Sequence, residues 1–573
     1  MRYASKTQFD GTKQINQCLT QCALQEQNEP IYRKLKLLEL GGIRALVVSH
    51  GCGLLGRLRK KTRIKHLGEE CMLKTKIKKG SGSNVVTLSA AALLSLTLVG
   101  CGNDGEQSAS GPVSTDGKSA AQVAVEAAKP LCEGGTTIRI VWEAGLQSLD
   151  PKNFSGPKWE EATGCKVEVV EVPTAEMFTK IMQEYRAGTG AYDALNVIPA
   201  WMPDLAQAGA LEQLDSYVDK YGYRGELQTI AATYRDNQMT VDGKIYGFPD
   251  DGDVFLMYYR KDLFARDDLK SAYQDKFGEA LEVPTTWEQF IQTGQFLTEA
   301  LKSEGIYGAS MFREPGYGNF MFQERFRNEG GKFFDANMKA TVNSSAGVKV
   351  FEDWITENKF MPKGVEKFGF VENLAVFVKG ESAMTISWPP YGRFAAGYLE
   401  NEEALSWVPK TTIGDKVGYA LPPGGHPELA AGFALSVAST SKNKEAAYLF
   451  IQWLNSEEIS NERVQLPYAL RDPFRDSHFT NEGYKALWPD AKDYLAALGE
   501  GAKTGLLDLS LIQTDKYEEA LRQGISRLWA GDNPQAILDD VAAEWDKITE
   551  QVGVDKQRSV YDSWAAKSGA YPN

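Results

Sequence analysis

The chain is poor in histidine and lacks the short motifs of common enzymes. Only four histidines occur in 573 residues, and two of them, His426 and His478, follow residue 101. Neither a Gly-x-Ser-x-Gly elbow nor a His-Glu-x-x-His pair is present. The Gly-Lys-Ser at 117–119 lacks the glycine five places earlier that a phosphate-binding loop requires. With no metal-ligand spacing and no cofactor motif, the sequence argues against an enzyme.

Positive charge is scarce beyond the first hundred residues. Residues 1–100 contain 17 basic and 6 acidic side chains, a net charge of +11, whereas residues 101–573 contain 46 basic and 70 acidic ones, a net charge of −24. A body this acidic repels phosphate backbones and anionic membrane surfaces. Nucleic acid is therefore not expected as a partner.

The only long apolar run begins after four lysines at 74, 76, 78 and 79, and it ends at Gly100. It is shorter than 20 residues and contains serines and threonines, so it is marginal for a membrane span. A basic region, an apolar region and a small residue are the parts of a signal peptide. The ending "LVGC" resembles the lipobox of bacterial lipoproteins, which predicts Cys101 as the lipidated first residue of an extracytoplasmic protein. A single transmembrane anchor is the alternative.

This signal at 72–100 lies in the middle of the chain, so residues 1–71 are interpreted as a doubtful extension. Residues 101–132 are mostly small and polar, and we expect a flexible tether there. Of seven cysteines, four precede the signal and one is Cys101. The remaining pair, Cys132 and Cys165, predicts a disulfide in an exported protein, with two free thiols as the alternative.

Strand and helix patterns alternate from residue 136 onward. "TIRIVWEAG", "KVEVVEVP" and "YDALNVIPA" have the apolar, β-branched composition of strands, and helical patterns with short connections lie between them. Further along, Thr286 and Gln289 form the pattern of a capping box. This alternation predicts a parallel, doubly wound α/β sheet, and the length indicates two α/β lobes.

Six segments in the same order carry a family resemblance. They are "KWEEATGCKVEVVEV", "YDALNVIPAWMPDLAQAGALEQLDSYV", "DGKIYGFPDDGDVFLMYYRKDLF", "VPTTWEQF", "KGESAMTISW" and "AAGFALSVASTSKNKEAAYLFIQWLNSEE". Over about 136–550 the chain resembles the extracellular solute-binding proteins of carbohydrate ABC importers, the maltose-binding-protein group. The resemblance implies a monomeric type II periplasmic-binding-protein fold with a ligand cleft between two lobes. It also implies delivery of the solute to a membrane permease.

The expected division is lobe 1 over 133–252 and 417–462, and lobe 2 over 253–416 and 463–573. A sugar needs aromatic rings for its C–H faces and polar side chains for its hydroxyls. Residues of both kinds stand at turns between the expected elements: Trp142, Glu143, Trp201, Asp251, Asp253, Glu314, Tyr317, Trp388, Tyr391, Arg471 and Tyr517.

Asp253 and Glu314 align with acidic ligand contacts of the maltose-binding relative, whereas Gln147 stands where that relative has a lysine. Trp388 and Tyr391 flank two prolines in "ISWPPYG", which predicts an irregular loop rather than a helix or central strand. Trp142 and Trp201 can instead be core, as can one of Trp388 and Tyr391, and Arg471 can pair with Asp472 or Asp476. Two other functions stay open: a receptor for a polyamine or another cation on the same fold, and a glycoside hydrolase using Asp253 and Glu314.

Overall fold

The structure is a computed structural model that describes residues 36–40, 43–47, 117–399, 401–429, 432–468, 470–567 and 569–571. The chain forms two units, Met1–Asp104 and Gly105–Asn573. In the first unit, β1 (Lys36–Leu40) and β2 (Ile43–Val47) form an antiparallel hairpin. The predicted signal peptide and Cys101 lie outside the described residues. Among the described helices, none is both long enough and apolar enough to cross a membrane.

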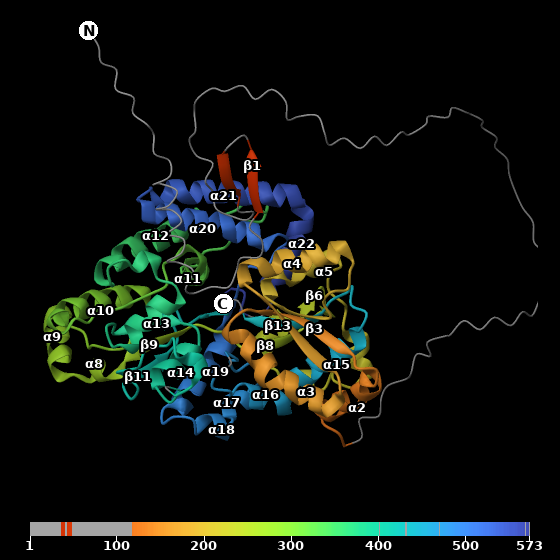
Figure 1. The fold of residues 1–573 in the computed structure, drawn as a ribbon. Helices are drawn as coiled ribbons and strands as arrows, with labels where there is room; N and C mark the ends of the chain where they lie inside the picture. The colour runs from red at the N-terminus through yellow and green to blue at the C-terminus, as the bar shows by residue number, and fades with distance from the viewer. Residues whose placement is uncertain are drawn as a thin grey trace, which may run out of the picture. The chain divides into compact units, whose positions relative to one another are not determined.

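A five-stranded sheet with the order β4-β3-β5-β13-β8 forms the centre of lobe 1 (Figure 1). Strand β3 runs parallel to β4, with Thr137 opposite Lys166, and parallel to β5, whereas β13 runs antiparallel to β5 and β8. The parallel part confirms the predicted strand–helix alternation. The bounds are β3 (Thr137–Glu143), β4 (Lys166–Val172), β5 (Ala194–Val197), β8 (Phe248–Asp251) and β13 (Phe433–Val437).

Alternate residues of β3 supply the cores on the two faces of this sheet. Ile138, Ile140 and Trp142 enter the larger core, whereas Val141 enters a smaller one. Helices α3 (Gly156–Thr163) and α15 (Lys444–Asn455) pack on the first face. Helices α4 (Thr174–Ala187) and α5 (Met202–Ala208) contribute to the smaller core. The sheet is therefore covered on both sides, as its apolar strands require.

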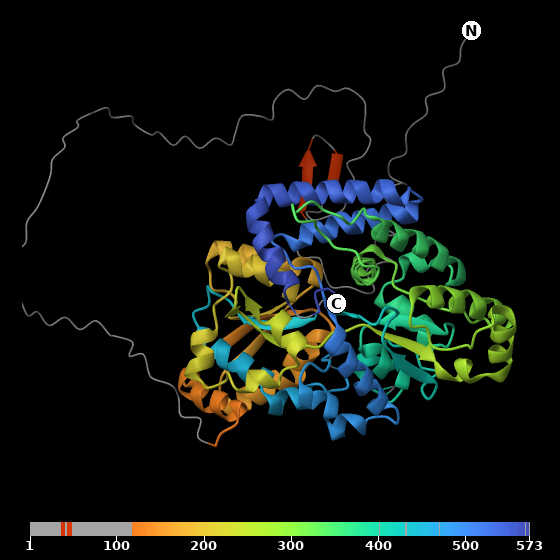
Figure 2. The same cartoon turned by 180° about the vertical axis from the view of Figure 1, so that it is seen from behind.

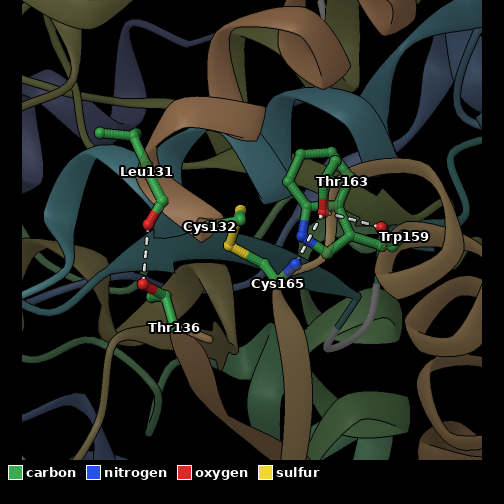
Figure 3. Close-up of a disulfide and its surroundings, with 6 residues drawn as sticks. All are labelled: Leu131, Cys132, Thr136, Trp159, Thr163 and Cys165. Atoms are coloured by element: carbon green, nitrogen blue, oxygen red, sulfur yellow. Dashed lines mark hydrogen bonds between the residues drawn. A yellow bond between two sulfur atoms is a disulfide. The ribbon is translucent and has the colours of Figure 1, made fainter. Parts of the chain in front are cut away.

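The predicted tether is wrong where helix α2 (Ala120–Cys132) forms. Ser119 and Gln122 make a capping box at its start, and Ala124 and Ala128 are fully buried against neighbouring elements that include α15. Small side chains let two helix backbones approach closely, so a segment of low hydrophobicity still buries a face. The predicted disulfide between Cys132 and Cys165 is present and joins the end of α2 to the start of β4 (Figure 3).

Lobe 2 contains a three-stranded antiparallel sheet with the order β10-β9-β11. Its strands are β9 (Leu256–Arg260), β10 (Met384–Ser387) and β11 (Val417–Ala420). Helix α10 (Trp287–Ala300) begins with the predicted capping box of Thr286 and Gln289. The "ISWPPYG" segment is not the predicted irregular loop, since β10 ends at Ser387 and helix α14 (Pro390–Ala396) begins after only two intervening residues. Proline is tolerated at the first helical position because that N–H has no helical acceptor.

Two of the predicted lobe boundaries need correction. Residues 417–420 pair with β9 in lobe 2, so the chain returns to lobe 1 only between Ala420 and Phe433. The segment after 463 is shared, because Arg463 and Arg475 contact lobe 1 residues before the chain continues into lobe 2. Strand β12 (Glu428–Leu429) pairs with β14 (Leu506–Leu507) along this route.

The C-terminal helices pack on lobe 2. Helices α20 (Thr514–Ala530) and α21 (Pro534–Val552) lie side by side and contact α11 (Pro315–Asn328) and α12 (Ser345–Glu357), as Figure 2 shows from behind. The other helices are α6 (Asp215–Lys220), α7 (Ala232–Gln238), α8 (Lys261–Ala265), α9 (Asp267–Phe277), α13 (Phe370–Val378), α16 (Glu457–Arg463), α17 (Asp476–Thr480), α18 (Glu482–Lys485), α19 (Ala491–Thr504) and α22 (Val554–Ala565).

Candidate functional site

Five buried aspartates gather where the lobe 1 sheet ends and the chain passes toward lobe 2. We call them the acidic group: Asp150, Asp250, Asp251, Asp253 and Asp472. Three buried arginines contact the group: Arg393, Arg463 and Arg471. The charged form of a buried carboxylate is expensive unless it is paired and hydrogen-bonded, so these contacts fix the geometry of the site.

Arg471 connects the acidic group to a tryptophan. Its Nε lies 3.2 Å from Oδ2 of Asp250, and its Nη1 lies 3.7 Å from Oδ2 of Asp251. The guanidinium also stands 5.1 Å from the ring centroid of Trp142, a cation–π arrangement. The sequence suggested Asp472 or Asp476 as the structural partner of Arg471, but Asp472 instead contacts Arg393 at 3.3 Å. Arg471 is fully buried, so it positions its neighbours rather than facing solvent.

Gln147 and Glu143 lie beside this arrangement. The Gln147 side chain donates from Nε2 to Oδ2 of Asp251 at 2.8 Å, and its backbone oxygen accepts from Arg471 at 2.8 Å. Glu143 accepts a hydrogen bond from the Thr174 hydroxyl. Burial raises the pKa of Glu143 against the opposing effects of Thr174 and Arg471.

Burial raises the pKa of three aspartates in the acidic group, Asp251, Asp253 and Asp472. Burial raises the pKa of Asp253 well above its ordinary value, and the neighbouring charges of Asp251 and Asp472 raise it further. Burial also raises the pKa of Asp472 to about 7, although Arg393 opposes this shift. Asp253 accepts one N–H, from Gly432 at 3.1 Å. The site thus holds carboxyl groups that can donate as well as accept hydrogen bonds near neutral pH.

An aromatic cluster from lobe 2 forms the second half of the site. Five aromatic rings have centroids within 6.3 Å of the Trp388 ring centroid: those of Phe255, Phe312, Tyr317, Phe320 and Phe370. Tyr317 is 36 % exposed, whereas Trp388 is 8 % exposed. Glu314 is the N-cap of α11 and accepts from the N–H groups of Gly316 and Tyr317 at 2.9 and 3.3 Å. The cap holds Tyr317 at the edge of the cluster.

The two halves are close enough to influence each other electrostatically. Burial raises the pKa of Tyr317, and the charge of Glu143 from lobe 1 raises it further, as does that of Glu314. Residues of β3 and of α11 therefore lie near one another although 174 positions separate Glu143 from Tyr317.

Three predicted site residues lie in packing positions. Tyr391 is fully buried and donates its hydroxyl to the backbone oxygen of Phe370 at 2.6 Å. Tyr517 is buried and bonds Thr549 at 2.9 Å. Trp201 packs edge-on against Phe178 in the smaller core of lobe 1, with 8 % of its surface exposed. In the described part of the chain, these contacts of Trp201 and Tyr517 lie outside the acidic group.

Sequence reasoning missed several members of the site. Asp150, Arg393 and Arg463 were not considered, because their partners lie far away in the sequence. Asp472 was considered only as a partner for Arg471, and Phe320 was not considered. One signal was available for each of the last two. Asp472 directly follows Arg471 in "LRDP", and Phe320 follows Tyr317 at i+3 on one helix face.

Comparison with known proteins assigns the class. Residues 141–460 match the bacterial extracellular solute-binding protein family, so the chain belongs to that family. It is 26 % identical over 340 residues to a probable amino-acid ABC transporter periplasmic-binding protein of Sinorhizobium fredii, covering 58 % of this chain and 72 % of the relative. It is 25 % identical over 383 residues to the erythritol/L-threitol-binding protein of Mycolicibacterium smegmatis, covering 63 % and 75 %.

A solved structure shows the same fold. It is an ABC transporter solute-binding protein from Agrobacterium radiobacter in complex with ribitol, with a TM-score of 0.59 and 20 % identity. The match covers 72 % of this chain and 99 % of that one. The predicted two-lobed, type II periplasmic-binding-protein fold is confirmed.

Proposed function

We propose that this chain is the substrate-binding component of an ABC importer and that it captures a sugar or polyol between its two lobes. The observation that carries the proposal is that Tyr317, at the exposed edge of the aromatic cluster in lobe 2, lies near Glu143 of lobe 1, which itself interacts electrostatically with Asp251 and Asp253 of the acidic group. Polyhydroxylated solutes need both surfaces, since their C–H groups pack on rings and their hydroxyls bond to carboxyl and amide groups.

The lobe 1 side suits hydroxyl groups in particular. Gln147 and Asp253 supply an amide and a carboxyl within the same buried region. Charge-assisted hydrogen bonds to hydroxyls are stronger than neutral ones, and they gain strength where water is excluded. Two of the similar proteins named above are an erythritol/L-threitol-binding protein and a solute-binding protein in complex with ribitol, which supports a polyol as the first candidate.

The proposal includes the cellular setting. The chain binds its solute without converting it, is anchored by a lipid on Cys101 at the outer side of a bacterial membrane, and passes the solute to permease subunits. The signal pattern at 72–100 supports the anchor, and the family supports the importer.

A positively charged solute is the second candidate, because the acidic group outnumbers the arginines that contact it. The relative described as a probable amino-acid transporter component also justifies amine ligands in any screen.

A thermal-shift screen of the purified protein against polyols, sugars, polyamines and amino acids tests the proposal. A ligand at 100 times its dissociation constant adds about 2.7 kcal/mol of stability. We expect the melting temperature to rise with a polyol or sugar. A rise only with amines selects the second candidate, and no response to any of these solutes contradicts both.

A further inference from the structure

Three carboxylates of the acidic group converge on one point. Asp251, Asp253 and Asp472 can each offer one oxygen such that these oxygens all lie within 4.8 Å of one another. They come from two chain segments held tightly together, since the Gly252 N–H donates to the Asp472 backbone oxygen at 3.1 Å. A Cβ at residue 252 would collide with the carbonyl oxygen of Pro473, so the approach depends on glycine.

Two buried oxygen atoms beside this point have no hydrogen-bond partner. One is Oδ2 of Asp472, and the other is Oε1 of Gln147. Gln147 is 6 % exposed, and Nε2 of the same amide donates to Asp251 at 2.8 Å. The orphaned oxygen therefore belongs to an amide that contacts the carboxylates, and a half-turn of the amide would present the oxygen to this point in exchange for the Nε2 hydrogen bond to Asp251. Both oxygens are therefore acceptors that a cation bound at this point could use.

The acidic and basic groups around the point do not balance. The acidic group contains five buried aspartates, and the buried arginines that contact it number three. Arg475 lies nearby but interacts with Glu226 outside the group. In the described part of the chain, carboxyl groups therefore outnumber guanidinium groups around this point, and a divalent cation bound there would offset the excess of acidic groups.

We propose that Asp251, Asp253 and Asp472, with the side-chain oxygen of Gln147, hold a divalent metal cation of the hard, oxygen-ligated class, of which Ca²⁺ is the best fit. Calcium takes carboxylate and amide oxygens at about 2.3–2.6 Å in flexible geometry. Oxygens on opposite sides of such an ion are therefore about 5 Å apart, which accommodates the 4.8 Å grouping. These four residues offer neither an imidazole nitrogen nor a thiolate sulfur, which disfavours zinc and copper.

Calorimetric titration of the chelator-treated protein with CaCl₂ tests this inference. We expect one calcium per chain and a higher melting temperature in its presence. The Asp253→Asn variant should bind calcium at least about tenfold more weakly, because it loses a charged ligand. Its metal-free melting temperature should equal or exceed that of the parent, since the change removes a carboxylate repelled by its neighbours. The matched control Asp275→Asn changes an exposed aspartate and should bind calcium like the parent.

Three results would overturn the inference. They are no binding at millimolar Ca²⁺ or Mg²⁺, equal binding by the parent and Asp253→Asn, and stabilisation by spermidine but not by Ca²⁺. The last would assign the offsetting positive charge to an amine. Binding of a polyol by a protein that binds no divalent cation would overturn this inference while leaving the proposed function intact.

Discussion

Tyr317 and Tyr391 belong to one aromatic cluster but differ in their surroundings. Tyr317 is 36 % exposed and lies near Glu143 of the opposite lobe, whereas Tyr391 is fully buried with its hydroxyl bonded to backbone. Exposure thus separates a ring that can stack on a solute from a ring that supports the cluster beneath it. The sequence motif "ISWPPYG" contributes Trp388, near the surface, and Tyr391, below it.

We predict opposite effects from two alanine substitutions. Tyr317→Ala should leave the ligand-free melting temperature nearly unchanged and weaken solute binding by about tenfold or more, since a ring stacked on the solute is lost. Tyr391→Ala should cost about 3–5 kcal/mol of stability, as for other buried aromatics. Thermal melting and calorimetric titration measure the two effects. Unchanged affinity in Tyr317→Ala would remove this ring from the binding site.

A second residue-scale prediction concerns Glu324 in α11. Its side chain is buried, neither carboxyl oxygen has a hydrogen-bond partner, and burial raises its pKa from 4.5 to about 8. Because the folded-state pKa is raised, this group's contribution to stability is full below about pH 4.5 and is lost as the pH rises through about 8.

The Glu324→Gln variant imitates the protonated form at every pH. Its melting temperature relative to the parent should therefore rise between about pH 5 and about pH 9. The exposed Glu352→Gln is the control and should show a constant difference. A flat profile for Glu324→Gln would mean that Arg325 or Arg327 keeps the carboxylate ionised.

At the scale of elements, the sequence predicted those helices and strands whose formation depends on interactions within a single segment. The composition of β3 and β4 and the capping box of α10 lie within single segments, and the structure confirms them. Helix α2 was missed because its buried face consists mainly of alanines, whose contribution depends on the neighbouring helix rather than on their own hydrophobicity.

The candidate site was less predictable than the elements that hold it. Arg471 contacts Asp150 and Asp250, residues more than 200 positions away. Tyr517 and Trp201 stand at plausible turns, yet their partners Thr549 and Phe178 draw them into packing. Long-range partners decide whether an aromatic or charged residue lines a site, and one sequence does not specify them.

The disulfide between Cys132 and Cys165 anchors α2 to β4 across 33 residues. Loop-closure entropy for this separation corresponds to about 3–4 kcal/mol. We predict that replacing both cysteines by serine lowers the free energy of unfolding by roughly this amount. Peptide mapping without reduction should find the two cysteines in one linked pair. Two free thiols in the native protein would contradict the account of this element.

At the scale of the whole molecule, the N-terminal processing is open to direct measurement. We predict that a chain started at Met72 is exported, cleaved before Cys101 and lipidated on that cysteine. Mass spectrometry of the mature protein should find a lipid-modified peptide beginning at Cys101. A mature peptide from residues 1–71 would contradict the signal peptide, and an unmodified Cys101 in a cleaved chain would remove the lipid anchor.

The central claim concerns both lobes: one solute binds at the same time to the aromatic surface of lobe 2 and to the polar surface of lobe 1. Native mass spectrometry tests this most directly. The purified protein is equilibrated with a mixture of polyols, sugars, polyamines and amino acids of distinct masses, and the bound mass is read from the intact complex. The account predicts a one-to-one complex with the mass of a polyol or sugar, reduced in Tyr317→Ala. A complex with an amine or amino acid instead, or no complex at all, would contradict it.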